Sequence, residues 1–281
     1  MDSPELANAN VVDGDRWRVP TTVAISRARA RLGAELLLLF AKVAGASGTP
    51  DTPGVFYRGL RVATVDGFTL DLQDTPENAE HFGRGGNGSG SLNPYPQLRV
   101  LVQAESGNRS LLAAAHGPCS TGEKTLALDL LPALGPGKLL LADWNFISWY
   151  LWAKAVATGA DLCWRVPSSF NLTPRTVLDD GTYLTQLRPP RKKDGDPATV
   201  RVVEYTVTTT DKAGGDAQSE VFALATTLLD PLQAPAEDLA DLDHRRWQAE
   251  TGIGDLKTAD RGGPDAVLRS KKPAEQELYA M

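Results

Sequence analysis

Four charged side chains in the C-terminal part of the chain have the types and the spacing needed to bind metal ions and phosphate groups. Placed on a helix at about 100° per residue, they share one stripe roughly 60° wide: Asp243, Arg246, Glu250 and Lys257. An apolar stripe that can pack on a core runs beside them, formed by Leu242, Ala249, Ile253 and Leu256. A carboxylate at the edge of a buried face can bind a metal ion, and neighbouring cations can hold phosphates. The alternative is a solvated face with ion pairs three and four residues apart.

Two further acidic residues each follow an apolar run that is typical of a buried strand. Residues 60–65 lead into Asp66, and residues 138–142 lead into Asp143. A carboxylate at the end of a buried strand, with no basic neighbour in sequence, is costly unless it is paired or bound to a metal. With a helical glutamate, the two aspartates would make an all-oxygen site that suits Mg²⁺ or Mn²⁺. Taken alone, each aspartate is more often a turn or capping residue.

The stretches around both aspartates resemble bacterial insertion-sequence transposases with an RNase H-like DDE core, of the insertion-sequence-four family. The first stretch covers residues 57–78 and the second covers residues 137–166. With the helical segment described above, the similarity extends over residues 17–281. It implies a chain that lacks part of both ends of the family's full length.

The helical segment carries the family signature of Tyr, two residues, Arg, three residues, Glu, six residues and Lys. Arg246, Glu250 and Lys257 fit this spacing, whereas Asp243 stands at the position of the Tyr. A second departure lies at residues 143–146, which read Asp-Trp-Asn-Phe where the family more usually has Arg-Gly or a similar pair after the acid.

The resemblance implies a cut-and-paste DNA transposase, an endonuclease that also performs strand transfer in DNA recombination. Asp66, Asp143 and Glu250 would together hold two Mg²⁺ or Mn²⁺ ions and would be the catalytic residues. The side chains that would contact DNA are Arg246 and Lys257, as phosphate ligands, and Trp247, for which packing is the alternative. The implied partners are double-stranded DNA, as terminal repeats and target, and a second copy of the chain in a DNA-bound homodimer.

The fold implied is α/β, with an RNase H-like mixed sheet flanked by helices and a β-rich insertion between Asp143 and Glu250. Alternating and β-branched runs predict antiparallel strands in this insertion, outside the central sheet. We divide the chain into a partial N-terminal helical region and linker (1–54), the first part of the core (55–166), the insertion (167–229), and the catalytic helix with a truncated C-terminal region (230–281).

A helix is predicted through residue 131, opened by a capping box in which Ser120 pairs with Glu123. Glu105 and Glu123 are alternative carboxylates for a metal site, but the capping role would occupy Glu123.

Composition gives weaker constraints. The formal net charge of −6 argues mildly against nucleic-acid binding, although five arginines occur between residues 16 and 31 with no acid among them. There is neither a transmembrane-length apolar run nor a signal peptide at the N-terminus, so we expect a cytoplasmic protein with no membrane partner. Cys119 and Cys163 lack metal-ligand spacing and are expected to be free thiols.

Two other functions stay open at this point. The chain could be an inactive, truncated remnant of a transposase, or a DNA-binding module without catalysis that inhibits a full-length relative. For Asp243 the sequence predicts an ion pair with Arg246 that competes with phosphate, so that Asp243→Tyr would improve binding of transposon ends.

Overall fold

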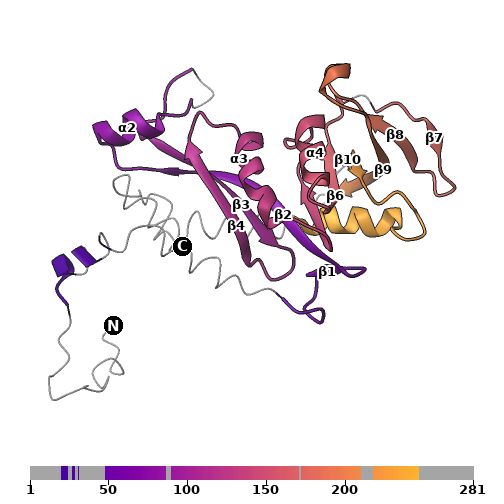
Figure 1. Cartoon of the computed structure of the whole chain (residues 1–281), viewed down its shortest axis with the longest axis horizontal. Helices are drawn as coiled ribbons and strands as arrows, with labels where there is room; N and C mark the ends of the chain where they lie inside the picture. Colours follow the sequence, from indigo (N-terminus) through magenta and orange to yellow (C-terminus); the bar gives the residue numbers. More distant parts are fainter. Residues whose placement is uncertain are drawn as a thin grey trace, which may run out of the picture.

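One sheet dominates the computed structural model (Figure 1). The structure describes residues 20–24, 27–28, 31, 48–86, 90–170, 172–209 and 218–246. Within these residues ten strands form the sheet, in the order β4-β3-β2-β5-β6-β10-β9-β8-β7, and β1 pairs with β2. Figure 1 shows α2 at the far end of the long strands β2 to β4, and β7 to β10 on the opposite side of the molecule.

The strands have these bounds: β1 Phe56–Tyr57, β2 Leu60–Asp71, β3 Gln97–Glu105, β4 Leu111–Pro118, β5 Lys138–Ala142, β6 Asp161–Val166, β7 Thr176–Val177, β8 Tyr183–Leu187, β9 Ala198–Thr209 and β10 Gln218–Thr226. Among the described residues, the α-helices are α2 Pro76–Phe82, α3 Glu123–Leu130, α4 Trp149–Val156 and a helix over residues 236–246, and residues 22–24, 27–28 and 31 are also helical. In the described part of the chain, short 3₁₀ helices occur at η2 Leu131–Ala133 and η3 Lys192–Asp194.

Five of the strands form the RNase H-like core. β2, β3 and β4 pair antiparallel as consecutive hairpins, while β5 and β6 add in parallel on the other side of β2. The parallel connections pass through α3 and α4, as parallel neighbours require a crossover. This mixed sheet with flanking helices confirms the predicted fold class.

The two faces of the core sheet bury alternate residues of each strand, because successive side chains point to opposite faces. One set packs with α3 and α4: Ala63, Val65, Leu140, Ala142, Leu162 and Trp164. The other set packs with Leu239 and Leu242 of helix 236–246: Val62, Leu139, Leu141 and Cys163. We call this second side the helix-236 face. Every second residue along each core strand, counted from these four, points to the same face.

The insertion strands are antiparallel, as predicted, but their expected position outside the central sheet is wrong. β10 pairs antiparallel with β6, and β9, β8 and β7 continue the same sheet. Without β10, the outer edge of β6 would present unpaired N–H and C=O groups beside an otherwise buried core. Pairing with β10 satisfies these groups and carries the apolar alternation of the core into the insertion.

The predicted capping box at the start of α3 is also wrong. The helix begins at Glu123, with Gly122 as N-cap and no side-chain cap hydrogen bond. A capping-box glutamate must lie three residues inside the helix, whereas Glu123 is its first residue. Its carboxylate instead accepts a hydrogen bond from Asn145 Nδ2 at 2.6 Å.

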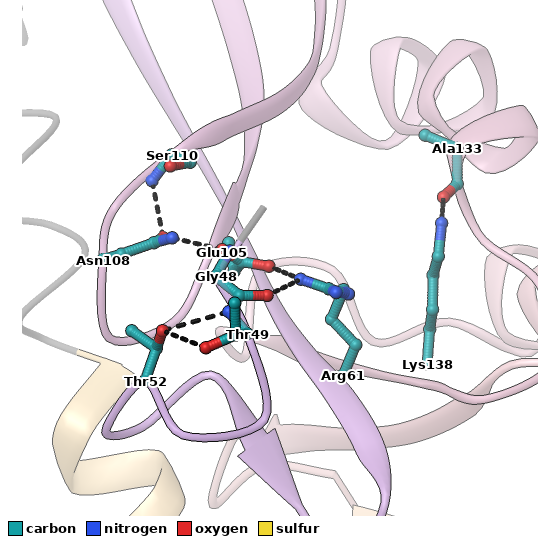
Figure 2. A network of polar contacts seen from close by, with 9 residues as sticks. All are labelled: Gly48, Thr49, Thr52, Arg61, Glu105, Asn108, Ser110, Ala133 and Lys138. Atoms are coloured by element: carbon teal, nitrogen blue, oxygen red, sulfur yellow. Dashed lines mark hydrogen bonds and ion pairs between the residues drawn. The ribbon is translucent and has the colours of Figure 1, made fainter. Parts of the chain in front are cut away.

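A buried carboxylate fastens residues 48–55 to the end of the β3–β4 hairpin (Figure 2). Glu105 is fully buried and accepts hydrogen bonds from Gly48 N, at 2.5 Å, and from Asn108 Nδ2. Its ion-pair partner is Arg61 Nη1, which also donates to Gly48 O at 3.1 Å. Glu105 is therefore occupied in structural contacts and is no candidate for a metal ligand.

Among the described residues, no helix is long and apolar enough to cross a membrane.

Candidate active site on the helix-236 face

Asp66 and Asp143 lie at neighbouring positions on adjacent parallel strands; Asp143 directly follows β5, whereas Asp66 lies within β2 and not at the strand end that the sequence predicts. Val65 of β2 is paired in register with Ala142 of β5, so Asp66 and Asp143 are the next residues along each strand. Val65 and Ala142 point toward α3 and α4, and the aspartates therefore belong to the helix-236 face. Adjacent strands are about 4.8 Å apart, so the register brings the two aspartates close together.

A third charged residue continues this row on β6. Ala142 is paired with Trp164, so the residue next to Asp143 in the row is Arg165. Like the aspartates, Arg165 alternates with side chains of the α3 and α4 side. The row thus reads acid, acid, base across three parallel strands, and we call it the charged row.

Helix 236–246 brings a second arginine against this row. Arg246 is only 2% exposed, and its Nη2 lies 3.7 Å from Asp143 Oδ1. Its Nε lies 3.4 Å from Asp243 Oδ1, one turn earlier on the helix. Pro235 precedes the helix and accepts from Leu239 N, and Leu239 and Leu242 hold the helix on the sheet. The guanidinium is therefore oriented by carboxylates from both the helix and the strand end.

Asp243 joins the helix to the insertion strands as well as to the core. Its Oδ2 accepts from Arg165 Nε at 2.5 Å and from the Tyr205 hydroxyl at 2.6 Å. Arg165 also stacks over the ring of Phe222, 4.2 Å from the ring centroid. Burial and the hydrogen bond to Asp243 raise the pKa of Tyr205, which keeps this hydroxyl a proton donor. Asp243, Arg246, Arg165 and Tyr205 form what we call the Asp243 cluster.

This arrangement corrects one interpretation of the charged helix stripe. The Asp243–Arg246 pair exists as predicted, but neither residue lies on a solvated face, since they are 3% and 2% exposed. The helix turn that carries them is part of the core. Glu250, Lys257 and Trp247 lie outside the described residues.

Arg165 and Tyr205 were not predicted as site residues. A sequence signal for Arg165 existed, because a charged residue within the otherwise apolar run of β6 falls at the same strand phase as Asp143. Tyr205 lies in an alternating strand with nothing in the sequence to connect it to Asp243. Its contact depends on β9 and β10 joining the central sheet.

The charged row fits a small divalent cation in the chemistry of its donors. Asp66 and Asp143 offer carboxylate oxygens, which Mg²⁺ and Mn²⁺ prefer, and Mg²⁺ commonly takes one or two protein carboxylates while keeping several waters. The Asp143 side chain is 30% exposed, so it is open to a ligand from solvent. Within the described part of the chain, no group of three or more His, Cys, Asp or Glu residues could hold a metal ion. The two aspartates are thus a pair that needs a further ligand.

An RNase H-like sheet with acidic residues at neighbouring positions of its central parallel strands is typical of the class of DDE-type nucleic-acid enzymes. A profile described as "Transposase DDE domain" matches residues 57–281, and the chain belongs to that family. Members of the family generally use divalent metal ions. The chain is similar to the transposase InsG for insertion sequence element IS4 of Escherichia coli (strain K12), with 30% identity over 265 residues. The match covers 92% of this chain and 58% of that relative.

Proposed function

We propose that this chain cleaves phosphodiester bonds at the ends of an insertion sequence and transfers the cut strand to target DNA. The observation that supports this most is the charged row, in which Asp66 and Asp143 are neighbours on parallel strands under a helix whose Arg246 reaches Asp143. Two carboxylates on adjacent strands with an oriented guanidinium suit the binding of a metal ion and a phosphate together.

In this proposal Asp66, Asp143 and Glu250 hold two Mg²⁺ or Mn²⁺ ions. Bound ions of this kind supply activation of water or a 3′-hydroxyl and stabilisation of the leaving oxygen. Arg246 has a fixed orientation, because Asp243 holds its Nε while Nη2 faces Asp143. It can therefore meet a phosphate beside the metal ligands without first being ordered.

The remaining parts of the proposal concern the DNA. Lys257 binds a phosphate as a point charge, and Trp247 contacts a base or sugar. The ligand is double-stranded DNA, first as the element's terminal repeats and then as target, and the chain acts as a homodimer on it in the cytoplasm. The relative's printed name, a transposase for an insertion sequence element, supports the substrate class.

Cleavage of a labelled duplex carrying the ends of the encoding element, in Mg²⁺ or Mn²⁺, tests the proposal. We expect cleavage by the wild type and loss of cleavage in Asp66→Asn and Asp143→Asn, with DNA binding retained. Asp241→Asn is the matched control, because Asp241 lies on helix 236–246 outside the charged row and makes an exposed ion pair with Arg245. DNA binding by the wild type without cleavage would instead favour a non-catalytic inhibitory module, and absence of both would favour an inactive copy.

A further inference from the structure

A buried arginine of the insertion is bonded to the segment that leads into helix 236–246. The side chain of Arg201, on β9, has no exposed surface, although a guanidinium keeps its charge at any physiological pH. Its Nη1 donates to the carbonyl oxygen of Ala234 at 2.6 Å and to that of Leu228 at 3.4 Å. Ala234 is the second residue before the helix begins. One side chain of an insertion strand therefore holds the start of the helix.

The turn between β7 and β8 fixes the orientation of this guanidinium. Arg201 Nε donates to Thr182 Oγ1 at 2.9 Å, and Nη2 donates to Asp180 Oδ2 at 2.7 Å. A buried ion pair is often no more stabilising than apolar residues of the same volume, because both ions lose water. The planar guanidinium does, however, direct its donors along fixed directions. The arrangement therefore fixes the geometry between the turn, β9 and the residues before the helix.

The same face of β9 holds the helix a second time, near its other end. Tyr205 lies four residues after Arg201 and therefore on the same side of the strand. Its hydroxyl donates to Asp243 at 2.6 Å. Val203, between the two, belongs to the apolar cluster that contains the buried leucines of the helix. Three successive side chains of one strand face thus contact the helix or the residues that begin it.

Strand and helix match in length between the two polar contacts. The four residues from Arg201 to Tyr205 span about 13 Å at about 3.3 Å per residue of strand. The eight residues from Pro235 to Asp243 span about 12 Å at 1.5 Å per residue of helix. The helix can therefore lie along β9 with both contacts made, and it cannot slide along the strand without breaking one of them. Arg246 follows the second contact by less than one helical turn.

We propose that β9 positions Arg246 for the reaction at the two aspartates of the charged row. Arg201 sets the start of helix 236–246 and Tyr205 sets its end, so both are positioning residues. This rests on the proposed function, since it requires phosphodiester chemistry at that site. Arg246 Nη2 lies 3.7 Å from Asp143 Oδ1 only while the helix keeps its place on the sheet. A displacement of about 1 Å can lower a reaction rate about 100-fold, so the insertion strand controls the rate without touching the DNA.

Distances between spin labels measure the position of the helix independently of activity. One label is attached at His244→Cys, on the exposed side of the helix, and the other at Lys154→Cys, on α4. Cys119 is replaced by serine, whereas Cys163 is buried and can stay. We expect a narrow distance distribution for this protein. Arg201→Met should shift its maximum by about 1 Å or more. Arg201→Lys keeps the charge but has a single compact ammonium group, and it should give a smaller shift in the same direction.

Glu105→Gln is the control for a general loss of stability. It breaks a different buried ion pair, and the Glu105 side chain contacts residues 48, 61 and 108. All proteins are compared at a temperature at which circular dichroism shows them folded. Glu105→Gln should keep the wild-type distances and the wild-type rate of cleavage at saturating Mg²⁺ and DNA. Arg201→Met should lower that rate about 10- to 100-fold, and Tyr205→Phe should lower it less, because Arg165 still holds Asp243.

The other outcomes overturn the inference. Unchanged distances in both Arg201 variants would refute the positioning role and leave the proposed function standing. Equal shifts in Arg201→Met and Glu105→Gln would also refute it, because the effect would then be one of stability alone. Shifted distances with an unchanged cleavage rate would show that the reaction does not depend on the contact. If Arg201→Met does not fold, Arg201→Lys decides. A wild type that does not cleave would refute the proposed function, whereas the distances test the holding of the helix in either case.

Discussion

Replacing Asp243 by alanine should destabilise the protein more than almost any other single change on helix 236–246. The carboxylate is 3% exposed and accepts from Arg165, Tyr205 and Arg246 at 2.5, 2.6 and 3.4 Å. Its removal leaves the largely buried Arg165 without its ion-pair partner and takes from Arg246 one of its two carboxylates, with Asp143 remaining at 3.7 Å. Breaking a buried ion pair in this way costs about 3–5 kcal/mol, a large part of a typical total stability of about 5–15 kcal/mol.

Urea unfolding followed by circular dichroism measures this loss, provided that the dependence of the unfolding free energy on urea concentration is the same in both proteins. Asp241→Ala is the control, because Asp241 is on the same helix and pairs with Arg245 at 2.5 Å while both side chains are about half exposed. An exposed pair of this kind contributes less than about 1 kcal/mol. Tyr205→Phe, alone and combined with Asp243→Ala, tests the contact itself. If the two residues are in contact, the free-energy changes of the single substitutions should not add up to that of the double substitution. Equal stabilities of Asp243→Ala and Asp241→Ala would refute the cluster as a source of stability.

The same geometry changes the expectation for Asp243→Tyr. The sequence favoured improved binding of DNA ends, on the assumption that Asp243 lies on an accessible stripe. In the structure a neutral ring would have to enter a buried polar cluster and would leave Arg165 without its carboxylate. We now expect Asp243→Tyr to lower stability, which the same unfolding experiment measures.

Three further predictions follow from described contacts. Glu105→Gln should lower the free energy of unfolding by about 3 kcal/mol, because it leaves Arg61 beside a buried neutral group; a loss below about 1 kcal/mol in urea unfolding would contradict this. The pKa of Tyr205 is raised above its ordinary 10.0 by burial and a hydrogen bond, so its contribution to stability is complete below pH 10 and falls as pH rises further. Tyr205→Phe should reduce the loss of unfolding free energy above pH 10, and an equal loss in the variant and the wild type would contradict this prediction. Gly67→Ala should displace Glu123 at a cost of about 1 kcal/mol, measured by thermal unfolding and by loss of the Glu123 contact in a crystal structure.

The local parts of the fold and the site were accessible from the sequence. An apolar run followed by an acid predicts a buried strand that ends in a carboxylate. Asp143 directly follows β5 as predicted, whereas Asp66 lies inside β2, which continues to Asp71. Their position as neighbours came from the family resemblance and agrees with the strand register. The roles proposed for both residues in catalysis stay predictions.

The parts that were missed depend on contacts between segments far apart in the chain. No local pattern says that β10 pairs with β6, because the alternation of β10 suits any sheet edge. The Asp243 cluster follows from that pairing, since it brings Tyr205 over the helix. The error at Ser120 has another origin: two residue types at capping-box spacing occur in a turn, and the helix begins three residues later.

The charged row also bears on how copies of a gene like this one decay. Asp143 faces Arg246 only because side chains alternate between the two faces along the five residues of β5 in the same register as in β2. Loss of a single codon within β5 would leave the reading frame, the composition and the apolar character almost unchanged. It would nevertheless turn the following carboxylate toward the opposite face of the sheet. A gene with such a deletion would look intact in translation while its product had lost the pairing of its two acids.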